Sequence, residues 1–60
     1  MTRAEALRKL LALGGLTEPE ARDICGWPRE EFNATLSGLI RAGVVTYLNG
    51  RHGVRVYQLT

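Results

Sequence analysis

The residues with the clearest chemical capability form a short basic cluster near the C-terminal end of the chain. Arg51 and His52 lie between two glycines in the run NGRHG, and Arg55 follows shortly after them. Guanidinium groups bind phosphate oxygens through charge-assisted hydrogen bonds, and a basic segment separate from the acidic residues is typical of proteins that neutralise nucleic-acid phosphates. The cluster therefore predicts that these three side chains contact a nucleic acid.

The same residues also have a structural interpretation. Charged side chains on an exposed hairpin discourage edge-to-edge pairing with another sheet, and Asn49-Gly50 is favourable turn chemistry. The sequence is compatible with both interpretations, which differ in whether the charges have a partner outside the chain.

No other group of residues has the composition of a catalytic or metal site. The single cysteine, Cys25, has no partner for a disulfide, and one Cys with one His falls short of the four ligands of a structural zinc site. The carboxylates lie where they would cap helices, and a chain of 60 residues has little room for a pocket. We expect a protein that is not an enzyme and that uses no cofactor or metal.

Length and composition favour a single folded domain over residues 1–60. Hydrophobic residues make up 45% and charged residues 23% of the chain, as in globular rather than disordered proteins. The net charge of +2 is compatible with a nucleic-acid partner. The chain has neither the apolar run of roughly 18 to 20 residues that a membrane span needs nor a signal peptide's apolar stretch, so we expect a cytoplasmic protein that does not bind membranes.

Three helices are predicted to support the basic cluster. The spacing of Thr2 to Glu5 and of Thr17 to Glu20 is that of a capping box at a helix start. Pro28 can open a further helix because its fixed φ suits the first turn, and glycines follow the end of each predicted helix. The predicted helices span about residues 3–13, 18–25 and 28–42.

Apolar side chains recur at helical spacing in the first and third helices. The side chains that recur in this way are Ala4, Leu7, Leu10, Leu11, Phe32, Leu36, Leu39 and Ile40. Trp27 is expected to anchor the second helix against the third, and Cys25 to lie beside Ile24 on the inner side of the second helix. The residues expected to face outward on the first helix are Arg3, Arg8 and Lys9.

The C-terminal part of the chain predicts a β-hairpin over about residues 44–59. The runs VVTYL and VRVYQLT are rich in β-branched and aromatic residues, and they flank a loop of about five residues, NGRHG. The period of two places Val45 with Tyr47, and Tyr57 with Leu59, on the face predicted to pack against the helices. The expected fold class is therefore α+β, with three helices followed by a hairpin.

This order of elements resembles the winged helix-turn-helix superfamily of DNA-binding domains, of the bacterial or phage regulator type. The chain from position 16 to its end is similar to the pattern of a helix-2 start, a Gly turn, L-x-x-L-x-x-x-G-V-V and a wing closing in Y-x-L-T. The resemblance covers about residues 3–60 and implies the fold more directly than the function, because the superfamily also contains members that bind proteins. The residues that carry it are Leu36, Leu39, Gly43, Val44, Val45, Tyr57, Leu59 and Thr60.

For this chain the resemblance implies a small transcriptional regulator that binds double-stranded DNA. The third helix would enter the major groove and the hairpin, as the wing, would contact the backbone or minor groove. Arg29 can pair with guanine, Asn33 with adenine, and Glu30 can accept from cytosine N4. A homodimer is expected because one such module buries little surface on DNA. The implied DNA-binding residues are Arg29, Glu30, Asn33, Ser37, Arg41, Arg51, His52 and Arg55.

The acidic residues of the helix-turn-helix half favour an alternative, a winged-helix module that docks on a protein partner without binding DNA. Five acids near phosphate would be repulsive: Glu18, Glu20, Asp23, Glu30 and Glu31. Capping and the helix macrodipole give a structural account of Glu18, Glu20 and Glu31. The sequence leaves both partners open.

Overall fold

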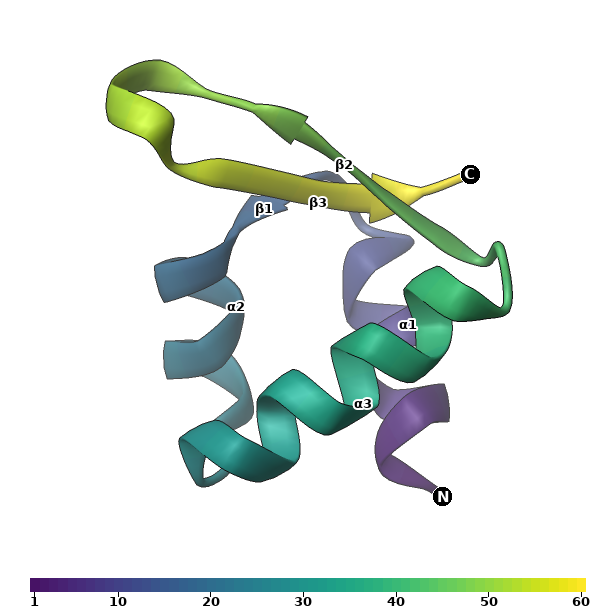
Figure 1. The fold of residues 1–60 in the computed structure, drawn as a ribbon. Helices are drawn as coiled ribbons and strands as arrows, with labels where there is room; N and C mark the ends of the chain where they lie inside the picture. The colour runs from purple at the N-terminus through teal and green to yellow at the C-terminus, as the bar shows by residue number, and fades with distance from the viewer.

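The computed structural model describes all 60 residues and confirms the α+β fold, with three helices followed by a C-terminal hairpin. The helices are α1 (Arg3–Leu11), α2 (Glu18–Cys25) and α3 (Arg29–Arg41), and the strands are β1 (Leu16–Thr17), β2 (Val45–Asn49) and β3 (Arg55–Leu59). Figure 1 shows the sheet as a layer above the helices, with α3 in front of α1. We call β2, β3 and the turn between them the wing. None of the helices combines the length and the hydrophobicity needed to cross a membrane.

The first two helices begin at the predicted threonines. The Thr2 hydroxyl accepts a hydrogen bond from the Glu5 amide at 3.2 Å. The Thr17 hydroxyl accepts one from the Glu20 amide at 3.4 Å, while the Glu20 carboxylate accepts one from the Thr17 amide at 3.2 Å, which completes a capping box. These contacts satisfy amides that the start of a helix leaves without intrahelical partners.

The first helix ends at Leu11, two residues before its predicted boundary. The amides of Leu13 and Gly14 donate hydrogen bonds to carbonyls three residues earlier, so the last turn tightens. Gly14 then adopts a φ of +145°, and a Cβ on Gly15 would lie 3.3 Å from Cγ1 of Val56 in β3. The helix ends early because the chain must pass close to the sheet.

The third helix is one residue shorter than predicted at each end. Pro28, with φ of −55° and ψ of 144°, precedes the first turn rather than belonging to it. Gly43 leaves the helix in the left-handed region at φ +76°, where glycine carries no steric penalty. The predicted apolar stripe is confirmed, with one half-buried member, Ile40, and three buried ones, Phe32, Leu36 and Leu39.

The three strands form an antiparallel sheet in the order β1-β3-β2. Within the predicted hairpin, Val45 lies opposite Leu59 and Tyr47 lies opposite Tyr57. The sequence analysis did not predict β1, because a strand of two residues has no recognisable periodicity. Its residue Thr17 pairs with β3 and also caps α2, so the wing is joined to the start of the helix-turn-helix.

A single core lies between the helices and the sheet. The predicted inner face of the hairpin is confirmed for Val45 and Tyr57, which are buried, and for Leu59, which is half-buried against the core. Tyr47 lies on that face opposite Tyr57 but is 41% exposed, because β2 is the edge strand of the sheet, whereas β3 is its central strand. The buried residues are Leu7, Leu11, Ala21, Phe32, Leu36, Leu39, Val45 and Tyr57.

The inner side of α2 differs from the expectation at Ile24, whereas Cys25 and Trp27 pack against the core as expected. Ile24 is 59% exposed, because the inward side of α2 is set by Ala21 and Cys25, four residues apart, and Ile24 falls beside that line. Cys25 is half-buried, and this burial raises the pKa of its thiol. Trp27 is half-buried at the edge of the core, where its ring centroid lies 6.5 Å from that of Phe32.

Candidate nucleic-acid interface

The outward face of α3 carries the predicted base-reading residues. The helix has 13 residues, which gives a length of about 20 Å at 1.5 Å per residue. Helical spacing puts Glu30, Ser37 and Arg41 on its outward line, with Arg29 and Asn33 one turn apart on the flank. All five of these side chains are exposed, as an interface requires.

Small residues occupy the centre of this face. Ala34, Ser37 and Gly38 leave the helix backbone close to the surface between Glu30 and Arg41. A Cβ on Gly38 would meet no atom within 4 Å, so no packing inside the chain requires glycine there. A glycine within a helix costs about 0.5 to 1 kcal/mol relative to alanine. No contact within the chain explains why position 38 is glycine rather than alanine.

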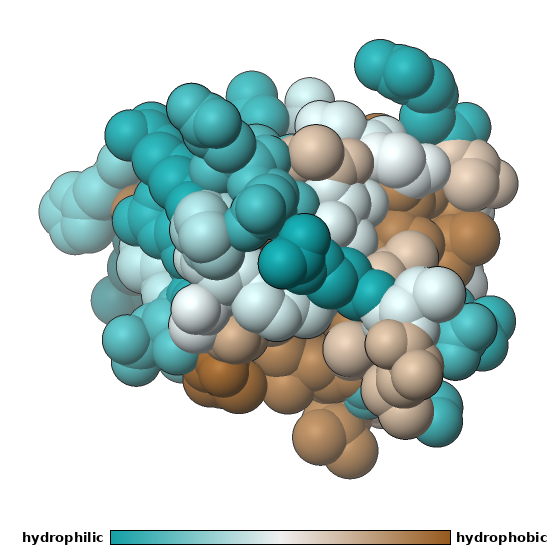
Figure 2. All heavy atoms as spheres, turned by 90° about the horizontal axis from the view of Figure 1, so that it is seen from below, coloured by the Kyte–Doolittle hydropathy of each residue, from teal (hydrophilic) through white to brown (hydrophobic).

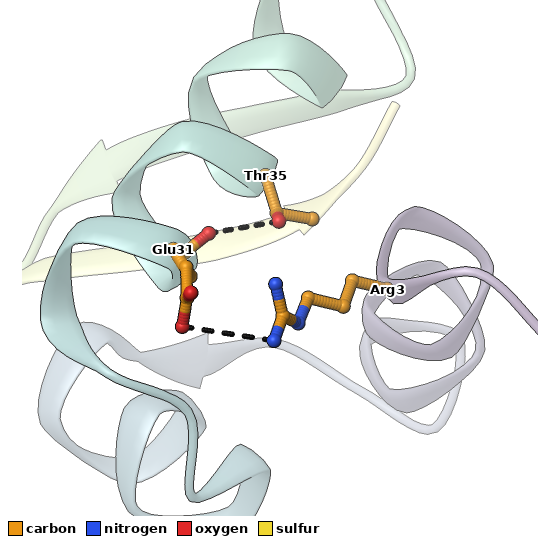
Figure 3. A network of polar contacts seen from close by, with 3 residues as sticks. All are labelled: Arg3, Glu31 and Thr35. Atoms are coloured by element: carbon orange, nitrogen blue, oxygen red, sulfur yellow. Dashed lines mark hydrogen bonds and ion pairs between the residues drawn. The ribbon is translucent and has the colours of Figure 1, made fainter.

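One acid of α3 is paired within the chain. Nη2 of Arg3, from α1, lies 3.6 Å from Oε2 of Glu31, and the Thr35 hydroxyl donates a hydrogen bond to the Glu31 carbonyl at 2.8 Å (Figure 3). The Arg3 guanidinium also lies 5.7 Å from the centroid of the Trp27 ring. Both charged side chains are about half exposed, so the pair stabilises the fold by less than about 1 kcal/mol. Arg3 was expected to face outward, but its side chain instead extends to α3 and pairs with Glu31.

Two further acids lie in the first turn of α2, and one of them, Glu20, has a hydrogen-bond partner inside the chain. The Glu20 carboxylate belongs to the capping box, and hydrogen bonds from the side chain and backbone of Thr17 hold the pKa of Glu20 below its ordinary value. Glu18 lies in the first turn of α2, near enough to Arg55 to favour that residue's positive charge. Among the acids of the helix-turn-helix half, Glu31 is the one in an ion pair, so its negative charge is offset within the chain. Asp23 and Glu30 are exposed and have no partner in the chain.

The wing tip, residues 50–54, is a closed turn that presents two basic side chains. The Gly50 amide donates a hydrogen bond to the Val54 carbonyl at 2.7 Å, and the Val54 amide donates one to the Arg51 carbonyl at 3.1 Å. A Cβ on Gly50 would lie 2.8 Å from the Val54 oxygen, so glycine is required there. His52 takes the left-handed conformation at φ +58°, and Arg51 and His52 are both exposed. The loop has the predicted length but begins one residue later, because Asn49 pairs with β3.

Arg55, the third basic residue of the wing, contacts an aromatic ring. Its guanidinium carbon lies 4.5 Å from the centroid of the Tyr47 ring, a cation–π contact. Tyr57 and then Tyr47 raise the pKa of Arg55 above its ordinary value, and Glu18 adds to this effect. The Tyr47 and Tyr57 rings are themselves in contact, with centroids 6.0 Å apart. The stacked guanidinium therefore keeps a fixed charge on the exposed surface of the wing.

The structure groups the predicted residues into two patches rather than one. Arg51, His52 and Arg55 lie on the wing, and the remaining five lie on α3. The wing follows Gly43, shortly after the end of α3. Its tip lies at the far end of β2, a strand of five residues with a length of about 17 Å. Because the longest dimension of the molecule is 32 Å, both patches fit within one turn of B-DNA, about 34 Å.

Tyr47 is the residue of this surface that the sequence analysis missed. It was predicted to pack on the helices, whereas it supports Arg55. The signal was present in the hairpin register, since a residue diagonal to Tyr47 across an antiparallel pair is within reach of a long side chain.

Comparison with known proteins gives no further guidance. The chain matches no protein-family model, no curated protein and no solved structure. A functional assignment is therefore supported by the placement and charge of these residues.

Proposed function

We propose that the chain is a small DNA-binding regulator of the winged helix-turn-helix type, with α3 in the major groove and the wing on the backbone or minor groove. The observation that carries the proposal is the separation of charge. The basic residues of the wing, Arg51, His52 and Arg55, are exposed and form no ion pair, whereas Glu31 is paired with Arg3 and Glu20 belongs to the capping box of α2.

The dimensions of α3 suit the major groove. The groove of B-DNA is about 12 Å wide and admits one α-helix. The small side chains at the centre of α3 would let its backbone approach closely, so that Arg29 and Asn33 on the flank reach guanine and adenine edges. Arg41, at the C-terminal end of the face, is placed to contact a phosphate.

The wing would supply contacts that do not depend on sequence. Arg51 and His52 at the tip and the stacked guanidinium of Arg55 present positive charge to the phosphate backbone. Each phosphate neutralised releases counterions and contributes about −0.9 to the slope of log affinity against log salt. Three arginine contacts, from Arg41, Arg51 and Arg55, therefore predict a slope of about −2.7.

An NMR titration with double-stranded DNA tests the proposal. Random-sequence duplex added to labelled protein at low salt should shift the amide signals of the wing tip and of the exposed face of α3. Asn33→Ala should change the preference among sequences in a duplex-library selection. Arg8→Ala, an exposed arginine on α1, is the matched control and should leave affinity close to that of the parent. The proposal is wrong if these signals do not move and the selection enriches no sequence.

The second candidate is a winged-helix module that docks on another protein without binding DNA. It is favoured by two exposed acids of the helix-turn-helix half that have no partner within the chain, Asp23 and Glu30. In that case DNA would leave the wing and α3 signals unchanged, and Arg51→Ala would have no effect on any DNA measurement. The same titration therefore separates the two candidates.

A further inference from the structure

Asn49 and Gly50, at the start of the wing turn, form an Asn-Gly pair whose chemistry the proposed function does not use. The backbone nitrogen of Gly50 can attack Cγ of Asn49, because glycine has no side chain to hinder the approach. The bond from Cγ to Nδ2 then breaks, and the amide proton of Gly50 leaves with the nitrogen as ammonia. Water opens the resulting succinimide ring to aspartate or isoaspartate, so a neutral amide is replaced by a carboxylate.

The closed wing turn holds the reacting atoms apart. The Gly50 amide donates its hydrogen bond to the Val54 carbonyl at 2.7 Å, and Asn49 is extended as the last residue of β2. A second bond, from the Val54 amide to the Arg51 carbonyl at 3.1 Å, closes the turn, and no residue from 49 to 54 is buried. Exposed segments held by a few hydrogen bonds open locally without global unfolding. The attack therefore requires the turn to open.

The other asparagine of the chain provides a comparison. Asn33 lies within α3 and is followed by Ala34, whose side chain hinders the same attack and whose amide faces the carbonyl four residues earlier in the helix. Figure 2 views the molecule from below and shows hydrophilic residues over its upper side, which is the side of the outward face of α3. Both asparagines are exposed, so the residue that follows each one, and not access to water, distinguishes them.

The strand register places the new carboxylate beside Arg55. Asn49 lies directly opposite Arg55, next to the hydrogen-bonded pair of Gly50 and Val54, so its own pair is of the type in which side chains lie closest. Stacking on Tyr47 occupies one face of the Arg55 guanidinium and leaves the N–H groups at its edge free. We propose that Asn49 is a site of spontaneous deamidation, controlled by opening of the wing turn, and that the carboxylate formed there pairs with Arg55.

Deamidation changes the charge of the wing. Residues 45–59 contain two arginines, Arg51 and Arg55, and no acid, so a single carboxylate lowers the net charge of the wing from two to one. The consequence for DNA rests on the proposed function, because it requires the wing to contact phosphates. The deamidation and the ion pair do not depend on DNA.

Mass spectrometry of the folded chain during incubation in mildly alkaline buffer tests the reaction. Position 49 should gain the mass of an amide-to-acid replacement, partly as isoaspartate, while Asn33 stays unchanged as the internal control. Each hydrogen bond of the turn should slow the reaction by about 2- to 10-fold, so the folded chain should react roughly 4- to 100-fold more slowly than the chain unfolded in urea. An unreacted Asn49, or equal rates in the two states, overturns the proposal.

The dependence of this rate on urea distinguishes opening of the turn from unfolding of the chain. Opening of the turn exposes little surface, so urea below the unfolding transition should leave the rate at Asn49 unchanged. A rate that rises in step with the unfolded fraction overturns control by the turn.

The ion pair is tested without DNA in the variant Asn49→Asp. By NMR titration, the new carboxylate should have a pKa below its ordinary value, and addition of Arg55→Ala should restore that value. Leu48→Asp is the matched control: Leu48 is exposed on the opposite face of β2, across from Val56, and its carboxylate should titrate normally. If Asn49→Asp fails to fold, the deamidated parent, separated by ion exchange, serves for the same titration. An ordinary pKa at position 49 overturns the ion pair.

Duplex binding tests the effect on the wing. Asn49→Asp should weaken binding about as much as Arg55→Ala and reduce the salt slope by about 0.9, and the two changes together should cost less than their sum. If the parent binds and Asn49→Asp binds equally well, the effect on the wing is overturned and the proposed function stands. A parent that does not bind DNA overturns the proposed function alone.

Discussion

Replacing Gly38 by alanine should stabilise the protein, although it lies in the surface proposed to bind DNA. The backbone at Gly38 belongs to α3, and a Cβ there would meet no atom within 4 Å. The methyl group therefore adds no clash, and the change should raise the free energy of unfolding by about 0.5 to 1 kcal/mol through lower chain entropy in the unfolded state. For a domain of this size, that corresponds to an increase of about 2 to 8 °C in Tm.

Gly26 provides the matched control. A Cβ on Gly26 would also meet no atom within 4 Å, but its φ is +67°, a conformation that costs a residue with a side chain about 1 to 2 kcal/mol. Gly26→Ala should therefore lower Tm while Gly38→Ala raises it, as measured by circular dichroism at 222 nm during heating and in urea. The reasoning is refuted if the two substitutions change stability in the same direction.

The stability measurement also bears on the proposed function. If α3 approaches DNA with its backbone at Gly38, the more stable Gly38→Ala variant should bind duplex DNA more weakly than the parent. Equal affinity would show that the glycine is merely tolerated on this face.

Four further predictions concern the supporting structure and the wing. Gly50→Ala should destabilise the protein by about 1 to 3 kcal/mol in urea unfolding, because its Cβ would lie 2.8 Å from a carbonyl oxygen; an unchanged midpoint would contradict the turn geometry. Thr17→Ala should cost about 1 kcal/mol. The hydrogen bonds from Thr17 lower the pKa of Glu20 from its ordinary 4.5. Their contribution to the free energy of unfolding is therefore present above that pH and is lost as the pH falls through the folded-state pKa. Glu20→Gln should lose less stability on acidification than the parent, and an identical loss in both proteins would exclude this linkage. Arg51→Ala and Arg55→Ala should each weaken binding to all duplex sequences and reduce the salt slope by about 1, whereas an effect restricted to one sequence would assign them to base recognition.

The sequence predicted the elements because their signals are local. Capping boxes, the apolar stripe of α3 and the alternation of the hairpin each involve residues within a few positions of one another, so three helices and the wing could be placed within one or two residues. The presence of β1 and the early end of α1 depend instead on the approach of Gly15 to β3, which is a tertiary contact. Ile24 was misplaced for a similar reason, since the packing of Ala21 decides which side of α2 is buried.

The candidate site was predictable in composition but not in arrangement. Its eight residues could be named from their types and from the resemblance, and all are exposed. The pairing of Arg3 with Glu31 and the stacking of Arg55 on Tyr47 require a helix crossing and a strand register, respectively. The sequence therefore identifies the charged residues, but it does not determine which of them have partners within the chain.

The way the wing is anchored makes its tip exchangeable. Val45 and Tyr57, the two buried residues of the wing, lie at its base and at its middle, and the turn from Gly50 to Val54 closes on its own hydrogen bonds. With Gly50 kept, the sequence and length of the rest of the turn can therefore vary with little effect on the core, since doubling the length of a flexible loop costs only about 0.6 kcal/mol. One small scaffold could carry many different tips, which makes this turn the natural position for grafting a new recognition loop.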